Sequence, residues 1–206
     1  MKCCRVFVFM LLMLFTACVT CSILFPVFRK VVVGNDTTNT VYFWYRQSST
    51  PIEGGDGVMM IRTYSYHLQC LQGQVYYTVM AALSVAATAF IASSALLTAC
   101  WINASYNDGL AVTSTFMSFI SLACCSATLG LTVCTYMTTL CPDEKTQILG
   151  AKADGYKLAE GFYLLCVATG GALLCFIAGF ALCCSTLCCS DEGKDDDDDD
   201  DDDDDE

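Results

Sequence analysis

Four long runs without a charged residue constrain the fold of this chain more than any other feature. The runs cover residues 6–28, 63–107, 109–142 and 161–190. A helix needs about 20 mainly apolar residues to cross the roughly 30 Å of hydrocarbon in a bilayer, and each run is long enough to supply one such helix. The chain is therefore predicted to be a membrane protein.

The composition also favours membrane helices over a soluble core. Hydrophobic residues make up 55% of the 206 residues, and charged residues only 16%. A soluble helix would show polar residues every few positions, whereas residues 6–28 and 161–190 show no such periodicity. We predict an all-α membrane protein in which residues 1–190 form a four-transmembrane-helix bundle, with both termini on one side. The expected helices cover about 6–28, 77–101, 112–137 and 161–184.

The first run also has some features of a secretory signal peptide. Lys2 and Arg5 precede it, and small residues at 16–18 offer a cleavage point. The apolar part of a signal peptide is only about 7–15 residues long, whereas this run continues to Phe28. We interpret it as a retained first helix.

The largest segment outside the helices, residues 29–75, combines charged residues with a pattern typical of strands. Residues 40–45 are rich in β-branched and aromatic side chains, which favour strands. Glycines in the segment 53–57 indicate a turn. We therefore predict that this large loop holds a small β hairpin.

The net charge of −12 belongs to the C-terminal tail and not to the membrane domain. Fourteen of the 22 acidic residues follow residue 190, including an unbroken aspartate run at 195–205. Such a run repels itself and buries no apolar area, so residues 191–206 are predicted to be a disordered poly-Asp tail. The tail is interpreted as a solvated segment or as a weak surface for Ca²⁺ or a basic protein.

The sequence shows no pattern of catalytic or metal-binding residues. It has one histidine, His67, and no nucleotide-binding loop, no HExxH or GxSxG motif and no carboxylate pair at catalytic spacing. The adjacent cysteine pairs lack the spacing of a zinc site. We predict no enzyme activity, no metal site, no cofactor and no nucleic-acid partner.

The predicted spans contain hydroxyl-bearing and small residues but no charged ones. The absence of charge argues against a pump or an ion-coupled transporter. Serine, threonine and backbone carbonyls can still line a pore. Small-residue spacings such as Ala82 to Ala86 allow close helix packing, either within one bundle or in a homo-oligomer.

The sixteen cysteines fall into three groups. Most lie within predicted spans, where cysteine acts as a small apolar residue. Cys70 and Cys141 fall in the two larger loops, and on an oxidising side they would form a disulfide. The third group flanks the first and last helices, where cytoplasmic palmitoylation occurs. Its members are Cys3, Cys4, Cys183, Cys184, Cys188 and Cys189.

The basic residues and the cysteines predict opposite orientations of the protein in the membrane. The two larger loops carry seven of the ten basic residues, so the positive-inside rule alone would place these loops in the cytoplasm. The flanking cysteines favour termini in the cytoplasm instead.

Several features of the layout belong together. They are a first helix near the N-terminus, an aromatic patch in a large first loop, Cys70 in YSYHLQC, Cys141-Pro142 after the third helix, and a Tyr/Gly-containing entry to the fourth. In these features the chain resembles the amastins, four-span surface proteins of trypanosomatid parasites, and the likeness covers most of the chain to about residue 185. The signature of the family is matched in offset by Val41, Phe43, Trp44 and Gln47. Thr40 and Thr50 stand where that signature has cysteines, so the chain resembles a divergent member, and its four-span layout is shared by claudin-like and tetraspanin-like proteins.

This resemblance implies a plasma-membrane protein with cytoplasmic termini. The loops 29–75 and 141–159 would then face outward, which exposes the glycosylation sequon at Asn35 and leaves the sequon at Asn103 inside.

The functional expectation is a structural, adhesive or host-interaction role through the outer loops. Tyr42, Phe43, Trp44 and Tyr45 are the expected contact cluster for a host or neighbouring membrane, because aromatic residues are favoured interface anchors. The same patch can instead be the core of the loop. The alternative function is a channel or transporter for a neutral solute or an ion.

Overall fold

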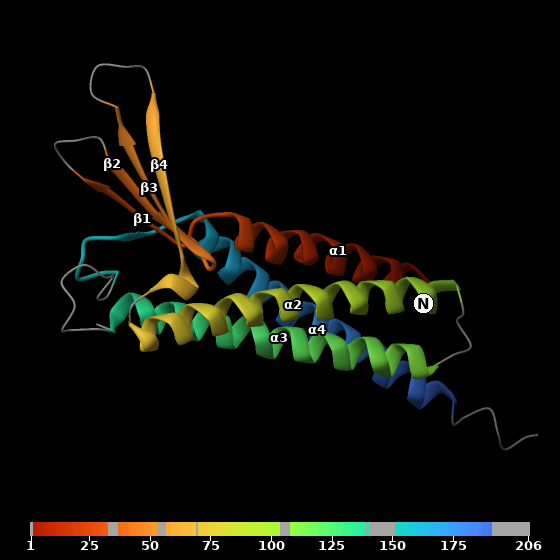
Figure 1. Ribbon diagram of the computed structural model, residues 1–206. Coiled ribbons are helices and arrows are strands. Elements are labelled where there is room, and N and C mark those ends of the chain that lie inside the picture. The colour runs from red at the N-terminus through yellow and green to blue at the C-terminus, as the bar shows by residue number, and fades with distance from the viewer. Residues whose placement is uncertain are drawn as a thin grey trace, which may run out of the picture.

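The computed structural model describes residues 2–32, 37–52, 57–68, 70–103, 108–138, 140 and 151–190. It shows a four-helix bundle with an antiparallel sheet at one end (Figure 1). The helices are α1 (Lys2–Leu24), α2 (Leu71–Asn103), α3 (Asp108–Met137) and α4 (Glu160–Ser190). All four are long and apolar enough to cross a bilayer, which confirms the four-span prediction at this level.

The helices pack in the cyclic order α1, α2, α3, α4, each against two neighbours. Small residues line the contacts, and Ala87 on α2 and Ala168 on α4 are fully buried. The outward faces carry exposed apolar side chains, such as Phe7, Phe116 and Leu174, that suit contact with lipid. The start of α1 and the end of α4 lie at the end of the bundle opposite the sheet (Figure 1).

Hydroxyl groups join α2 to α3. The Ser94 hydroxyl lies 2.9 Å from that of Ser114 and 2.7 Å from that of Ser118, and Thr98 is 2.8 Å from Ser114. Ser121 donates to a backbone carbonyl of α2 at 3.0 Å. All of these side chains are buried. These side chains form interhelical hydrogen bonds in an apolar environment.

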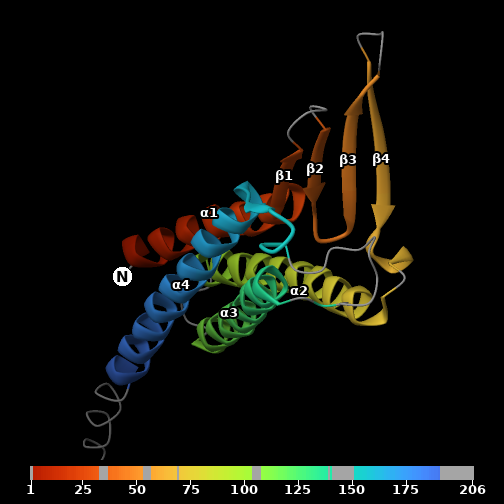
Figure 2. The ribbon, with the colours of Figure 1, turned by 90° about the vertical axis from the view of Figure 1, so that its left-hand side faces the viewer.

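The sheet is larger than the predicted hairpin. Its strand order is β4-β3-β2-β1-β5, and every neighbouring pair is antiparallel (Figure 2). The strands are β1 (Phe28–Val32), β2 (Thr37–Val41), β3 (Tyr45–Pro51), β4 (Val58–Tyr64) and β5 (Lys157–Leu158). A short 3-10 helix, η1 (Ser65–His67), leads from β4 toward α2. Four strands come from the large loop, and the fifth comes from the link before α4.

The first helix ends earlier than predicted. It stops at Leu24 and not at Phe28, which is already the first residue of β1. Pro26 explains the end, because proline cannot donate the helical hydrogen bond and disfavours helical geometry in the residue before it. The helix also begins earlier, at Lys2, and therefore contains Arg5.

Arg5 corrects the prediction that charged residues lie outside the helical spans. Its side chain is 6% exposed, its guanidinium lies 4.0 Å from the Trp101 ring centroid, and Nη1 donates to the Trp101 carbonyl at 3.4 Å. This contact fastens the start of α1 to the end of α2. A cation over an indole face is favourable when water is excluded.

Backbone hydrogen bonds fix the sheet to the bundle. The Val27 amide donates to the Val41 carbonyl at 2.7 Å, and the Ala159 amide donates to the Val27 carbonyl at 2.9 Å. The Gly161 amide donates to the Pro26 carbonyl oxygen, and a Cβ on Gly161 would lie 2.9 Å from that same oxygen. The end of α1 and the start of α4 approach so closely here that only glycine fits.

An apolar cluster fills the junction beneath the sheet. Phe28 and Phe43 are each 1% exposed and pack with Tyr77 and Leu165 from the helices. The Phe28 ring also stacks on Tyr136, with centroids 5.7 Å apart. This core makes the base of the sheet and the end of the bundle one packed unit.

Candidate interaction surface on the extramembrane sheet

The aromatic patch predicted as a contact cluster is divided by the fold. Val41 and Phe43 are 2% and 1% exposed and belong to the junction core. Trp44 is 43% exposed, and Tyr42 and Tyr45 are half-buried. The patch therefore supplies both a loop core and an outer surface. It lies in the β2–β3 turn, at the base of the sheet near the bundle (Figure 2).

An aromatic row continues from this turn across the sheet. Tyr42 stacks on Tyr45 at 4.5 Å between centroids, Tyr45 meets Tyr64 edge-on at 6.1 Å, and Tyr64 stacks on Tyr66 at 5.4 Å. His67 lies 4.5 Å beyond Tyr66. Sequence reasoning missed Tyr64 and Tyr66, although their spacing in TYSYH was the available signal.

The edge strand β4 is the most exposed apolar feature of the sheet. All seven of its residues are exposed, and Val58, Met59, Met60 and Ile61 are between 52% and 59% exposed. In the described part of the chain, β4 pairs only with β3, so its outer edge is open. An open apolar edge is a template for pairing with another strand. This segment was not among the residues expected to carry a function.

The one charged residue of β4 is turned toward β3. The Arg62 Nε donates to Gln47 Oε1 at 3.2 Å, and its guanidinium lies 5.3 Å from the Tyr45 ring centroid. Gln47, which was predicted to belong to the signature patch, therefore hydrogen-bonds to the edge strand near its base. The distal half of β4 is left without a charge.

The threonines at the positions of the family cysteines are not cross-strand partners. Thr40 on β2 pairs with Gln47, whereas Thr50 on β3 pairs with Met59 on β4. Two cysteines substituted at 40 and 50 would not lie opposite one another in this register.

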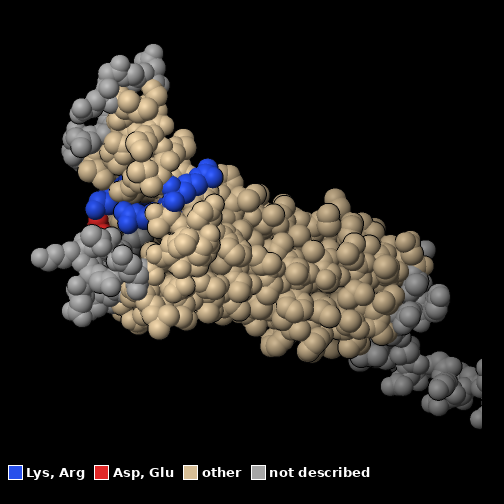
Figure 3. Space-filling view, viewed as in Figure 1, with Lys and Arg blue, Asp and Glu red and all other residues tan. Residues whose placement is uncertain are grey.

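Basic side chains gather where the sheet meets the bundle (Figure 3). The Lys30 ammonium and the Arg46 guanidinium lie 5.6 and 6.0 Å from the ring centroid of Tyr156, which is 4% exposed. Burial raises the pKa of the Tyr156 hydroxyl, Arg46 counteracts that rise, and Asp154 adds to it. Among the described residues, none hydrogen-bonds to the Tyr156 hydroxyl.

The cysteines at the two ends of the bundle differ in their bonding and exposure. Cys70, at the sheet end, is in a disulfide. Its predicted partner, Cys141, lies outside the described residues, so this pairing stays a prediction. At the opposite end, Cys3 and Cys4 are exposed free thiols, Cys184 is exposed and Cys183 is half-buried. The side chains of Cys188 and Cys189 lie outside the described residues.

Other predicted sites fall on parts of the chain that the structure does not describe. Asn35 lies in sequence between Val32, the end of β1, and Thr37, the start of β2, and is outside the described residues. The poly-Asp tail is outside them as well. Within the described residues, no cluster of three or more His, Cys, Asp or Glu side chains has the geometry of a metal site.

Comparison with known families and proteins gives no match. No protein-family model matches the chain, and no curated protein is similar to it at a significant level.

Proposed function

We propose that this protein is an adhesive surface protein of the plasma membrane that binds a polypeptide on a facing membrane through β4. The observation that carries the proposal is the open edge of β4, whose four consecutive residues Val58 to Ile61 are apolar and more than half exposed. A partner strand would gain backbone hydrogen bonds from the edge and apolar contacts from the side chains. Soluble surfaces rarely leave such an edge uncovered.

The amastin-like resemblance and the cytoplasmic placement of the termini belong to the same proposal. The disulfide at Cys70 supports it, because disulfides persist on the oxidising, outer side of the plasma membrane. Exposed thiols at Cys3 and Cys4 on the opposite end suit a reducing compartment and palmitoylation. A tag on the tail should therefore be stained only in permeabilised cells, and staining of intact cells would refute this orientation.

The adhesion test compares cells that display the protein on their surface. Met59→Lys/Ile61→Lys places two charges on the edge strand, and we expect it to reduce cell attachment at least severalfold at equal surface level. Val31→Lys is the matched control, since Val31 is 61% exposed on β1. Equal loss in the control, or full attachment by the β4 variant, would refute the role of β4.

Trp44→Ala tests whether the adhesive contact is made by the edge strand or by the aromatic turn. Trp44 lies at the base of the sheet, so attachment should stay close to that of the unaltered protein. If Trp44→Ala abolishes attachment and the β4 variant does not, the contact lies in the turn and the proposal for β4 is wrong.

No observation favours the channel alternative within the described residues. The hydroxyls best placed to line a path, such as Ser94, Ser114 and Ser118, hydrogen-bond to one another between α2 and α3. They are buried where α2 packs on α3.

A further inference from the structure

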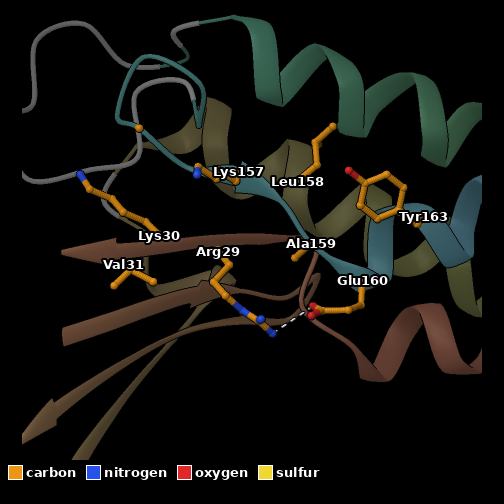
Figure 4. A pocket seen from close by; sticks show the side chains of 9 residues that line it. Arg29, Lys30, Val31, Lys157, Leu158, Ala159, Glu160 and Tyr163 are labelled. Atoms are coloured by element: carbon orange, nitrogen blue, oxygen red, sulfur yellow. Dashed lines mark hydrogen bonds and ion pairs between the residues drawn. The ribbon is translucent and has the colours of Figure 1, made fainter. Parts of the chain in front are cut away.

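A cavity of about 460 Å³ opens where β1, β5 and the first turn of α4 meet (Figure 4). Its polar wall contains Arg29, Lys30, Lys157 and Glu160. Its apolar wall includes Tyr163, whose ring faces the cavity from α4. The cavity is separate from β4, which lies at the far edge of the sheet.

The charges of this cavity do not balance. Arg29 on β1 and Lys157 on β5 are direct cross-strand partners, so two positive side chains stand opposite each other on one face. Such a pair is destabilising unless negative charge offsets it. Glu160 offsets Arg29, with Oε2 2.9 Å from Nη2. Lys157 is exposed and has no ion pair in the described part of the chain, which leaves the cavity positive.

The cavity lies where two helices that are long and apolar enough to cross a bilayer end and begin. The candidate span of α1 ends at Leu24, shortly before β1, and the candidate span of α4 begins at Glu160. Tyr163 is 59% exposed in the first turn of α4, a position typical of interfacial tyrosines.

An exposed apolar face continues from the cavity along α4, away from the sheet. Tyr163, Val167 and Leu174 recur at helical spacing, and each is more than half exposed. Gly170 lies between Val167 and Leu174 on this face, and no atom lies within 4 Å of the position its Cβ would take. The missing side chain leaves a gap in this exposed face.

We propose that this cavity binds the phosphate-bearing headgroup of a membrane lipid. Lys157 and Arg29 would contact the phosphate, and an acyl chain would lie along the exposed face of α4 over Gly170. Free inorganic phosphate shares the headgroup chemistry, but it would make no use of Tyr163 or of the apolar face of α4. A lipid accounts for both the charged and the apolar walls.

Binding is tested with the full-length chain in detergent micelles, using native mass spectrometry and thermal unfolding. The probes are dioctanoyl phosphatidylglycerol, its phosphatidylcholine analogue and inorganic phosphate. We expect the phosphatidylglycerol to bind most tightly, and to bind more weakly as salt concentration rises. Lys157→Gln should weaken it about tenfold, the loss of one charge-assisted contact.

Lys152→Gln is the matched control. It removes one positive charge from the same end of the protein, but Lys152 is exposed and does not line the cavity. Lys157→Gln is not expected to change unfolding without lipid, because its side chain is exposed. Equal weakening by both variants, or none by Lys157→Gln, would overturn the site.

A second pair of measurements identifies the source of the phosphate. Gly170→Leu fills the gap in the apolar face of α4 and should weaken phosphatidylglycerol binding without changing the response to inorganic phosphate. If inorganic phosphate displaces phosphatidylglycerol at similar concentration and Gly170→Leu has no effect, the lipid assignment is wrong.

Discussion

Gly171 is the position at which the bundle should be least tolerant of an added methyl group. It lies on α4 against the ring of Phe15 on α1, and a Cβ at this position would overlap three ring carbons of Phe15. Phe15 is 9% exposed and packs with Leu12 and Cys175, so its ring has little room to turn away. Gly171→Ala must therefore push α1 and α4 apart.

The loss of stability expected for Gly171→Ala follows from two opposing effects. Overpacking of a core costs about 1–3 kcal/mol, and the ring overlap places this site near the upper value. Alanine regains about 1 kcal/mol through its higher helix propensity. The net loss of about 2 kcal/mol corresponds to a fall of about 4–8 °C in unfolding temperature for a chain of this length.

Gly170→Ala is the neighbouring control, because no atom lies within 4 Å of its Cβ position. It should leave the unfolding temperature unchanged or raise it. Thermal unfolding of the full-length variants in one detergent, followed by circular dichroism at 222 nm, measures both. If Gly171→Ala and Gly170→Ala unfold at the same midpoint temperature, the argument from the Phe15 contact is refuted.

A double-mutant cycle with Phe15→Leu tests the mechanism itself. The smaller side chain should relieve the overlap, so Gly171→Ala should cost less in the Phe15→Leu background than alone. Strict additivity of the two changes would mean that the cost of Gly171→Ala arises elsewhere.

Further predictions concern buried polar groups, the disulfide and glycosylation. Ser94→Ala should destabilise the bundle by about 0.6–1.7 kcal/mol in thermal unfolding, the range of interhelical hydrogen bonds in membranes. Burial raises the pKa of Tyr156, so above about pH 10 the unfolded chain loses this proton first and stability falls as pH rises. Tyr156→Phe should reduce that fall, and at pH 7 it should cost little, because no residue in the described part of the chain hydrogen-bonds to this hydroxyl. Cys70→Ser should lower stability by about 2–4 kcal/mol, and peptide mapping without reductant should show Cys70 linked to the Cys141 peptide. Enzymatic deglycosylation should shift the electrophoretic mobility of the unaltered protein but not of Asn35→Gln.

The helices were predictable from the sequence because lipid imposes a simple requirement on them. An apolar run of sufficient length specifies a span without knowledge of its neighbours. The errors came from single residues inside or beside the runs. Pro26 ends α1 within a run that hydropathy alone treats as continuous, and Arg5 joins the helix because Trp101, almost a hundred residues away, supplies its contact.

The sheet was only partly predictable because its pairing is not local. The aromatic residues around Trp44 indicated strand structure, and β2 and β3 do form a hairpin there. The pairing of Phe28 with Leu158 joins segments 130 residues apart, and no local pattern encodes it. The exposure of β4 depends on its place at the edge, so the apolar residues from Val58 to Ile61 could not be assigned to a surface before the strand order was known.

The basic residues and the disulfide at the sheet end predict opposite orientations of the protein in the membrane. The contacts of the basic residues explain why their number is the weaker guide. The positive-inside rule counts basic residues as if they stood in loops near the membrane. Arg29 is paired with Glu160, and Lys30 lies over the buried ring of Tyr156, so these charges have structural roles that the rule does not consider. The disulfide at Cys70 has no such second explanation, because a reducing compartment would not maintain it. If the lipid site at Lys157 and the proposed orientation are both correct, some of the same basic residues bind headgroups of the outer leaflet, and Lys157→Gln should then change lipid binding without changing the side on which the tail lies.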